Sequence, residues 1–163
     1  MREQKDRCIF FVLENFFFLI PLPFVDKVIE NSLPEEREPE TEFIDLWAES
    51  GKNSKNKYCI LINCKEEKFG VPAAEILGFR DIAEGQVWEL TEPVRVKKNR
   101  YLCAAHETQL EDGRKVLAYL LDVDELRSWR KEEARWTRFR RIQAPNSFIQ
   151  RKTRQNRFRH VRR

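Results

Sequence analysis

The residues of this sequence that could perform chemistry are two histidines, four cysteines and one group of carboxylates. His106 lies three residues after Cys103, but a zinc site needs further ligands at defined spacing, and the sequence does not provide them. No C-x-x-C spacing occurs, and three of the cysteines lie in apolar runs, where a thiol behaves as a small hydrophobe. We therefore expect no metal site, reduced thiols and a cytoplasmic protein. The cysteines are Cys8, Cys59, Cys64 and Cys103.

The carboxylates Asp122, Asp124 and Glu125 lie where an apolar strand pattern changes to a helical one. An aspartate at such a junction caps the first turn and interacts favourably with the helix dipole, so Asp122 or Asp124 is the expected N-cap. The five glycines are scattered singly, which leaves no Gly-rich phosphate loop. We expect no catalytic residue and no cofactor, and hence no enzyme.

Two similar units would position these residues. Shifting the sequence by 51 positions places Cys8 to Val28 over Cys59 to Phe79, with four identities. Both units predict an apolar strand, a polar break, a second strand, a proline and then a short helix, over 22–30 and 73–77. Equivalent apolar positions of the two units are predicted to be buried, namely Phe18, Ile20, Val25, Phe69, Val71 and Ile76.

The rest of the chain predicts more strands and one long helix. Residues 31–41 and 51–57 are polar linkers, and strands are expected near 42–47, 78–82, 94–96, 101–108 and 115–121. Asp112-Gly113 between alternating apolar runs predicts a hairpin. A helical period begins at Asp122 and ends before Pro145. The apolar run from Cys8 to Val25 is broken by Glu14, Asn15 and two prolines, so we expect no membrane span.

These elements resemble the CheW-like domain, the adaptor module of bacterial chemotaxis, over about residues 8 to 127. The matching pieces are FFVLENFFFLIPLPFVDKVIE, FIDLW, YCILINCKEEKFGVPAAEILGF and RKVLAYLLDVDEL. The resemblance implies a mainly β fold of two small β-barrel (SH3-like) subdomains, with halves at about 8–50 and 57–121. It also implies a non-catalytic adaptor in signal transduction, whose partners would be a chemoreceptor or a CheA-type histidine kinase.

The chain departs from that family in two places. Only residues 31–41 stand where the family carries a strand, a Gly-rich turn and a further motif, so the first barrel is expected to be incomplete. The second departure is the C-terminal part, which we divide into a helix at 122–143 and a basic flexible tail at 144–163, following the β body at 1–127. Residues 127–163 carry a net charge of +12, against −8 for residues 1–126.

The basic part offers an alternative function, which is nucleic-acid binding. Lysines and arginines there could neutralise phosphates, or the tail could fold back on the acidic body. Trp129, Trp136 and Phe139 recur at helical spacing and form either a docking stripe for another protein or a face that packs on its own domain. The candidate polyanion-binding residues are Arg138, Arg140, Arg141, Arg151, Lys152, Arg154, Arg157, Arg159, Arg162 and Arg163.

Overall fold

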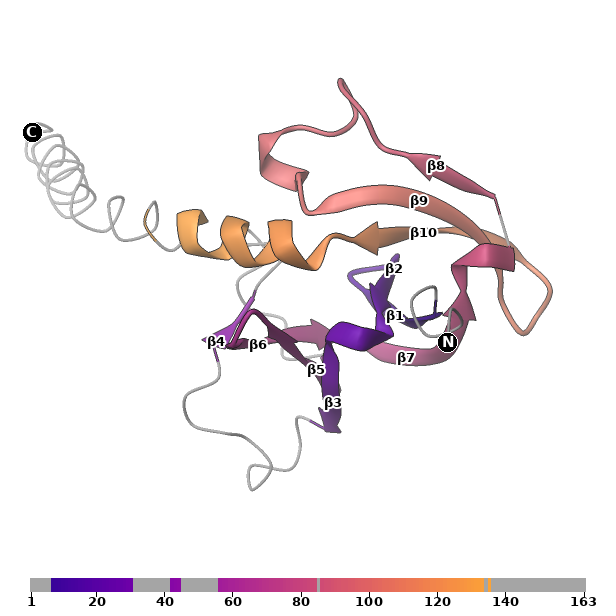
Figure 1. Cartoon of the computed structure of the whole chain (residues 1–163). Helices are drawn as coiled ribbons and strands as arrows, with labels where there is room; N and C mark the ends of the chain where they lie inside the picture. Colours follow the sequence, from indigo (N-terminus) through magenta and orange to yellow (C-terminus); the bar gives the residue numbers. More distant parts are fainter. Residues whose placement is uncertain (1–6, 31–41, 45–55, 85, 134, 136–163) are drawn as a thin grey trace, which may run out of the picture. The chain divides into compact units, whose positions relative to one another are not determined.

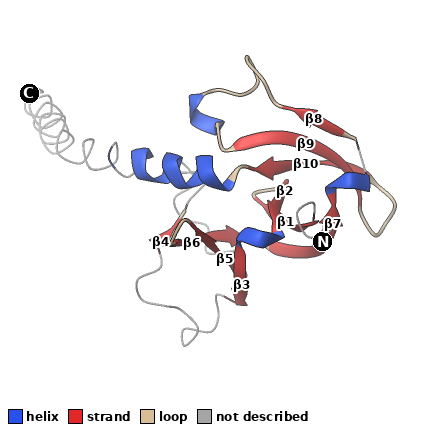
Figure 2. Ribbon diagram, viewed as in Figure 1, coloured by secondary structure: helices blue, strands red, loops and turns tan. Residues whose placement is uncertain are grey.

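The structure is a computed structural model that describes residues 7–30, 42–44, 56–84, 86–133 and 135. Within these residues ten strands form two sheets, a six-stranded sheet with the order β7-β1-β2-β10-β9-β8 (sheet A) and a four-stranded sheet with the order β3-β5-β6-β4 (sheet B) (Figures 1 and 2). Neither sheet closes on itself by strand pairing within the described residues. The strands are β1 (Arg7–Leu13), β2 (Phe16–Pro21), β3 (Val25–Glu30), β4 (Glu42–Phe43), β5 (Tyr58–Cys64), β6 (Glu67–Ala73), β7 (Glu75–Asp81), β8 (Val87–Glu89), β9 (Leu102–Gln109) and β10 (Lys115–Leu121).

The two repeated units both begin with a β-hairpin, as the sequence predicts. In β1–β2 the residues Phe11 and Phe18 are paired, and in β5–β6 the equivalent pair is Ile62 and Phe69. Both turns consist of two residues with positive φ, at 50° and 67° in the first hairpin and at 49° and 65° in the second. Positive φ at both central residues is the geometry of a type I′ turn, whose twist matches that of the flanking strands.

The third strand of each unit crosses to the sheet of the other unit. Strand β3 follows β2 but pairs antiparallel with β5 in sheet B, whereas β7 follows β6 but pairs with β1 in sheet A. At the second crossover the backbone N–H of Ala74 donates to the carbonyl oxygen of Val12 at 2.8 Å. Each sheet therefore contains strands from both sequence halves.

The short helices predicted after the two prolines are wrong. Only Leu22–Phe24 forms a 3₁₀ turn, and Val25–Glu30 is strand β3. In the second unit, residues 73–77 belong to the end of β6 and the start of β7. The apolar spacing fits a helix, but Val25, Val28 and Ile29 are β-branched, and pairing with β5 satisfies their backbone groups.

The core lies on both faces of the hairpin strands. On one face of sheet A, Phe10 packs with Cys8, Leu19 and Ala118. Phe11 lies on the opposite face and stacks on Phe18, with ring centroids 5.5 Å apart. This two-sided burial explains why β1 is a nearly continuous apolar run.

Four of the six burial predictions are confirmed. Phe18, Ile20, Phe69 and Val71 are no more than 1% exposed, whereas Val25 and Ile76 are only half-buried because they lie in the crossing strands.

The C-terminal part of the body is a hairpin followed by a helix. Strands β9 and β10 pair antiparallel, and β10 also pairs parallel with β2. The predicted turn at Asp112-Gly113 is confirmed, with φ of Gly113 at 87°. Residues 94–96 form no strand, which corrects that prediction, and the 3₁₀ helices Ile82–Glu84 and Lys97–Asn99 flank the region of β8. A helix covers residues 123–133.

Several expectations concern residues outside the described part of the chain. These are the linker at 31–41 on which the incomplete first barrel was inferred, most of the linker at 51–57, most of the strand at 42–47, and the tail at 144–163. Within the described residues, no helix has the length and apolar character needed to span a bilayer.

Candidate protein-binding surface

Of the site residues predicted from the sequence, the structure describes only Trp129. It lies on the helix at 123–133, and 8% of its surface is exposed. Trp136, Phe139 and the ten candidate polyanion-binding residues lie outside the described residues. The docking stripe and the polyanion site therefore lie largely outside the part of the chain that the structure describes.

The nucleophilic side chains lie in surroundings that suppress their reactivity. Burial raises the pKa of the Cys103 thiol, which donates to the carbonyl oxygen of Leu120 at 3.4 Å. Burial, together with nearby Asp124, raises the pKa of the Cys64 thiol. A reactive cysteine needs a lowered pKa, so neither thiol is poised as a nucleophile.

His106 is buried, with 3% of its surface exposed. It lies on β9, where it is paired with Ala118 of β10 and with Val87 of β8. Neither ring nitrogen has a hydrogen-bond partner among the described residues. Burial lowers the pKa of His106, so the ring is neutral at pH 7. No cluster of three or more metal-ligating side chains occurs among the described residues.

The carboxylates at the strand-to-helix junction have structural roles. Oδ1 of Asp122 accepts a hydrogen bond from the backbone N–H of Glu125 at 3.1 Å, which confirms Asp122 as the N-cap. Asp124 instead pairs with Nζ of Lys65 at 2.9 Å. Its hydrogen bond with Lys65 lowers the pKa of Asp124. A proton donor needs a raised pKa, so this group is not arranged for acid catalysis.

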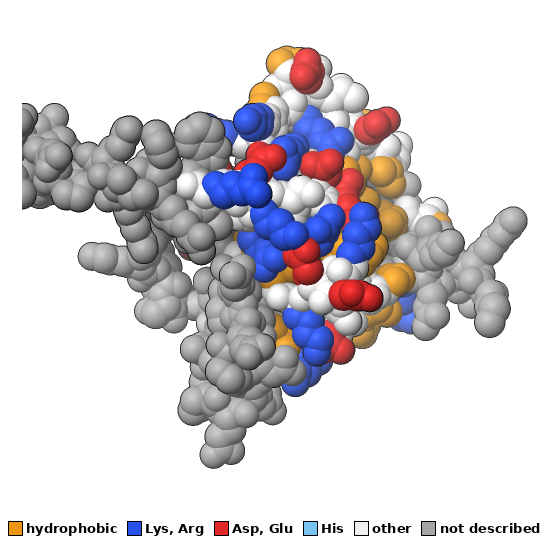
Figure 3. Space-filling model, turned by 60° about the vertical axis from the view of Figure 1, so that its left-hand side comes forward, with side chains coloured by type: hydrophobic (Ala, Val, Ile, Leu, Met, Phe, Trp, Pro, Cys, Tyr) orange, Lys and Arg blue, Asp and Glu red, His pale blue; other side chains and the backbone are white. Residues whose placement is uncertain are grey.

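Ion pairs also join the first turns of this helix to the body. Arg127 pairs with Glu67 at 3.2 Å, and Arg100 pairs with Glu125 at 3.1 Å. The face shown in Figure 3 carries basic and acidic side chains side by side, with apolar side chains among them. That face is therefore not a single-sign surface of the kind that binds polyanions.

Strand β8 is an apolar strand at the edge of sheet A. Val87 and Trp88 are neighbours in the strand, so their side chains point to opposite faces, yet 47% and 44% of their surfaces are exposed. Described residues therefore cover neither face of β8 completely. The strand was missed in the sequence because three residues, VWE, are too few for a period to be read.

One side of the β8 backbone carries hydrogen-bonding groups that do not face β9. Gln86 accepts from the N–H of Glu107 at 3.1 Å, and the N–H of Leu90 donates to Cys103 at 2.9 Å. Because alternate residues of an antiparallel pair face the partner, Val87 and Glu89 direct their N–H and C=O groups away from β9. Within the described residues β8 is the last strand of sheet A, so these groups are available to another strand.

An aromatic row extends from Trp88 across sheet A. Trp88 is paired with Ala105 of β9, Ala105 with Tyr119 of β10, and Tyr119 with Phe18 of β2. The rings of Phe18 and Tyr119 lie 6.2 Å apart. Exposure increases along the row, from buried Phe18 to half-buried Tyr119 and exposed Trp88. Leu117, two residues before Tyr119, is 49% exposed. The apolar surface therefore begins at the buried Phe18 and ends at the exposed Trp88.

The β3 edge of sheet B carries charged side chains, unlike β8 at the edge of sheet A. Its edge strand β3 exposes Asp26 and Lys27, and its register with β5 shifts between Val25 and Lys27. Charges and irregularities of this kind protect an edge against unwanted pairing. The β8 segment lacks a lysine, and its apolar side chains make it the better candidate for binding another protein.

Comparison with known proteins gives a similarity of fold. No protein-family model matches the chain, and no curated protein matches it. Among solved structures, it is similar to the scaffolding protein TtCheW from Thermoanaerobacter tengcongensis, with a TM-score of 0.52 and 17% sequence identity. The match covers 72% of this chain and 89% of that chain. The chain has a CheW-like fold.

The CheW-like fold confirms the resemblance and the mainly β fold class that the sequence predicted. The prediction rested on the order of strand, turn and proline pieces, of which none is specific alone. At 17% identity the similarity concerns the fold, and it transfers no individual binding residue. The β8 surface is therefore a candidate from its own exposure and backbone geometry.

Proposed function

We propose that this chain is a non-catalytic adaptor of bacterial signal transduction that acts by binding other proteins. Its expected partners are a chemoreceptor or a CheA-type histidine kinase, both of which would meet it in the cytoplasm. The CheW-like fold supports the class, since the similar solved structure is that of a scaffolding protein. The observation that carries the proposal is the apolar, unpaired edge at β8, where Val87 and Trp88 are exposed.

The β8 edge can bind a partner by strand addition. The outward N–H and C=O groups of Val87 and Glu89 supply backbone hydrogen bonds, which give affinity with little sequence demand. Trp88 and Leu117 supply apolar area beside the new strand. Exposed tryptophans at the centre of an interface contribute strongly to binding, because they bury a large area at low cost in side-chain entropy.

A binding assay with purified partners tests this proposal. The full-length chain would be titrated against the cytoplasmic part of a chemoreceptor and against a CheA-type kinase, both from the same organism as the chain. We expect Trp88→Ala to weaken one of these interactions by about tenfold or more. Phe79→Ala is the matched control, because Phe79 is 52% exposed on β7, at the opposite edge of the same sheet.

Two results would contradict the proposal. One is binding of neither partner by the wild-type chain, which would remove the adaptor role. The other is equal loss of binding in the Trp88 and Phe79 variants, which would keep the role but move it away from β8. A chain truncated after residue 143 should bind the same protein partner, whereas a protein that acts by binding nucleic acid through its tail would lose its activity.

A further inference from the structure

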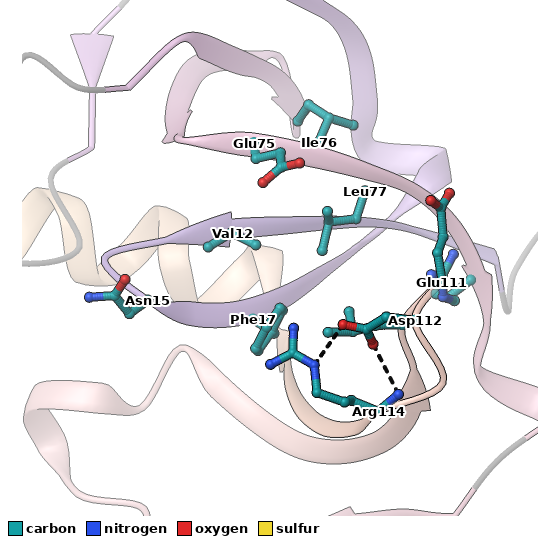
Figure 4. Close-up of a pocket in the computed structure, with 11 residues that line it drawn as sticks. Val12, Asn15, Phe17, Glu75, Ile76, Leu77, Glu111, Asp112 and Arg114 are labelled. Carbon is teal, nitrogen blue, oxygen red and sulfur yellow. Dashed lines mark hydrogen bonds and ion pairs between the residues drawn. The ribbon is translucent and has the colours of Figure 1, made fainter.

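A groove opens at one end of sheet A, away from the exposed side chains of β8. It lies between the β1–β2 turn, strand β7 and the turn that joins β9 to β10, and Figure 4 shows the side chains that line it. Its volume is about 590 Å³. This size falls within the range of ligand pockets, and the mouth of a curled sheet is one of the places where such pockets form.

The floor of the groove is apolar and incompletely covered. Each of its four large apolar side chains is half-buried. Three of them also pack against the buried cluster around Phe10, so the core holds them in place before any ligand arrives. The floor consists of Val12, Phe17, Leu77 and Leu110, of which Phe17, Leu77 and Leu110 contact the core cluster.

The two basic side chains at the groove are already engaged. Arg114 donates through Nε to Oδ2 of Asp112 at 2.7 Å, as Figure 4 shows, so this pair neutralises itself. Arg80 lies over the ring of Phe10, with 4.7 Å between its guanidinium carbon and the ring centroid. It also donates hydrogen bonds to Thr108 and to two backbone carbonyls.

Two acidic side chains at the groove are not engaged. Glu75 comes from the start of β7 and Glu111 from the turn between β9 and β10, and Figure 4 shows them on separate elements that border the groove. Neither forms an ion pair with any described residue. The groove thus presents an apolar floor bordered by two carboxylates that lack counter-ions in this part of the chain.

We propose that this groove binds a segment of another protein in which a large apolar side chain lies between two Lys or Arg residues. The apolar side chain covers the floor around Leu77 and Leu110, and the two cations meet Glu75 and Glu111. The groove and the Trp88 surface involve different residues, so the chain can hold two proteins at once. The groove proposal does not depend on binding at β8.

A pair of short peptides tests the proposal by NMR. The probes are acetyl-Gly-Arg-Leu-Arg-Gly-amide and its acidic counterpart acetyl-Gly-Glu-Leu-Glu-Gly-amide, each titrated into the isotope-labelled full chain. We expect the arginine peptide to shift the signals of Val12, Leu77 and Leu110 in a saturable manner. Affinity should fall as salt is added, because exposed charges are screened. The acidic peptide should leave these signals unchanged.

Charge-removal variants then identify the carboxylates. The double variant Glu75→Gln with Glu111→Gln should weaken binding of the arginine peptide by about threefold to tenfold, the range expected for two exposed ion pairs. Glu66→Gln is the matched control, because it removes an exposed carboxylate from the β5–β6 turn in sheet B. Trp88→Ala is a second control and should not change peptide binding, whatever its effect at β8.

Three outcomes would overturn the proposal. They are equal binding of the two peptides, shifts confined to residues outside the groove, and the absence of any shift with the arginine peptide at millimolar concentration. All three carboxylates are exposed, so a loss of binding with an unchanged unfolding midpoint reflects the groove and not the stability of the fold.

Discussion

Arg80 of β7 donates a hydrogen bond from Nε to Oγ1 of Thr108 on β9, at 3.2 Å. These strands are not neighbours, because β1, β2 and β10 lie between them in the order of sheet A. Arg80 also lies over the Phe10 ring and donates to the carbonyl oxygen of Phe79 at 2.7 Å. A single side chain therefore connects one edge region of the open sheet to a strand near the other edge and stabilises its curvature.

The Arg80–Thr108 contact should contribute measurably to stability. A double-mutant cycle with Arg80→Met and Thr108→Val should give a coupling free energy of about 0.5–1.5 kcal/mol, because the hydrogen bond is partly buried. Chemical denaturation of the four proteins measures it. Arg114→Met is the control, since Arg114 belongs to an exposed ion pair and its loss should lower stability less than Arg80→Met. A coupling of zero would show that the hydrogen bond between Arg80 and Thr108 adds nothing to stability.

Phe69 should be among the most important core residues. It is fully buried on β6 and occupies the position equivalent to Phe18 in the other unit. Phe69→Ala should lower the free energy of unfolding by about 3–5 kcal/mol, through lost burial and the cavity that remains. Phe79→Ala, at an exposed site, should change it by less than about 1 kcal/mol. Similar unfolding midpoints for these two variants in urea would contradict the burial of Phe69.

His106 should make stability depend on pH. Its folded pKa is lowered by burial, whereas in the unfolded chain the ring titrates near its usual value of 6.5. Above that pH both states are neutral, and stability is at its full value. As pH falls below 6.5, the unfolded state takes up a proton first, so stability decreases by at most about 1.4 kcal/mol per pH unit. The small cavity that His106 lines is also bordered by charged side chains of both signs, Arg80 and Lys115 with Asp81 and Glu107.

The variant His106→Leu separates this effect from other titrations. Its ring-free side chain leaves no unsatisfied nitrogen, so at pH 7.5 it should be at least as stable as the wild type. The difference in unfolding free energy between wild type and variant should change between pH 7 and pH 5. The titration of carboxylates contributes equally to both proteins and so does not affect this difference. A constant difference over this range would mean that His106 has the same pKa in both states.

The basic C-terminal segment should bind polyanions without sequence preference. Residues 151–163 contain seven Lys or Arg. If all seven met phosphates of duplex DNA, the logarithm of affinity would fall with that of salt at a slope near −6, which is about −0.9 for each contact. Two unrelated duplexes should be tested in a salt series, with and without residues 144–163. Strong preference for one duplex, or binding that survives the truncation, would contradict this prediction.

Local sequence signals determined the hairpins and the helix start. Glu14-Asn15 and its counterpart at 65–66 end apolar runs and require a tight turn, and Asp112-Gly113 tolerates positive φ. The side chain of Asp122 accepts a hydrogen bond from the backbone N–H of Glu125, in the first turn of its helix. Each of these interactions closes within a few residues, so neighbouring residues suffice to predict it. The mainly β fold and the CheW-like order of elements follow from these local units.

The tertiary structure decided which strands pair and what is exposed. Val25, Val28 and Ile29 have a spacing that suits either a helix or a strand, and the hydrogen bonds offered by β5, some thirty residues away, made them a strand. His106 lies between Ala118 of β10 and Val87 of β8, which the sheet pairing places beside it, and Trp88 is exposed where the pairing of sheet A ends within the described residues. Such outcomes depend on the burial and hydrogen bonding of strands that are distant in sequence. A local sequence pattern therefore does not determine them.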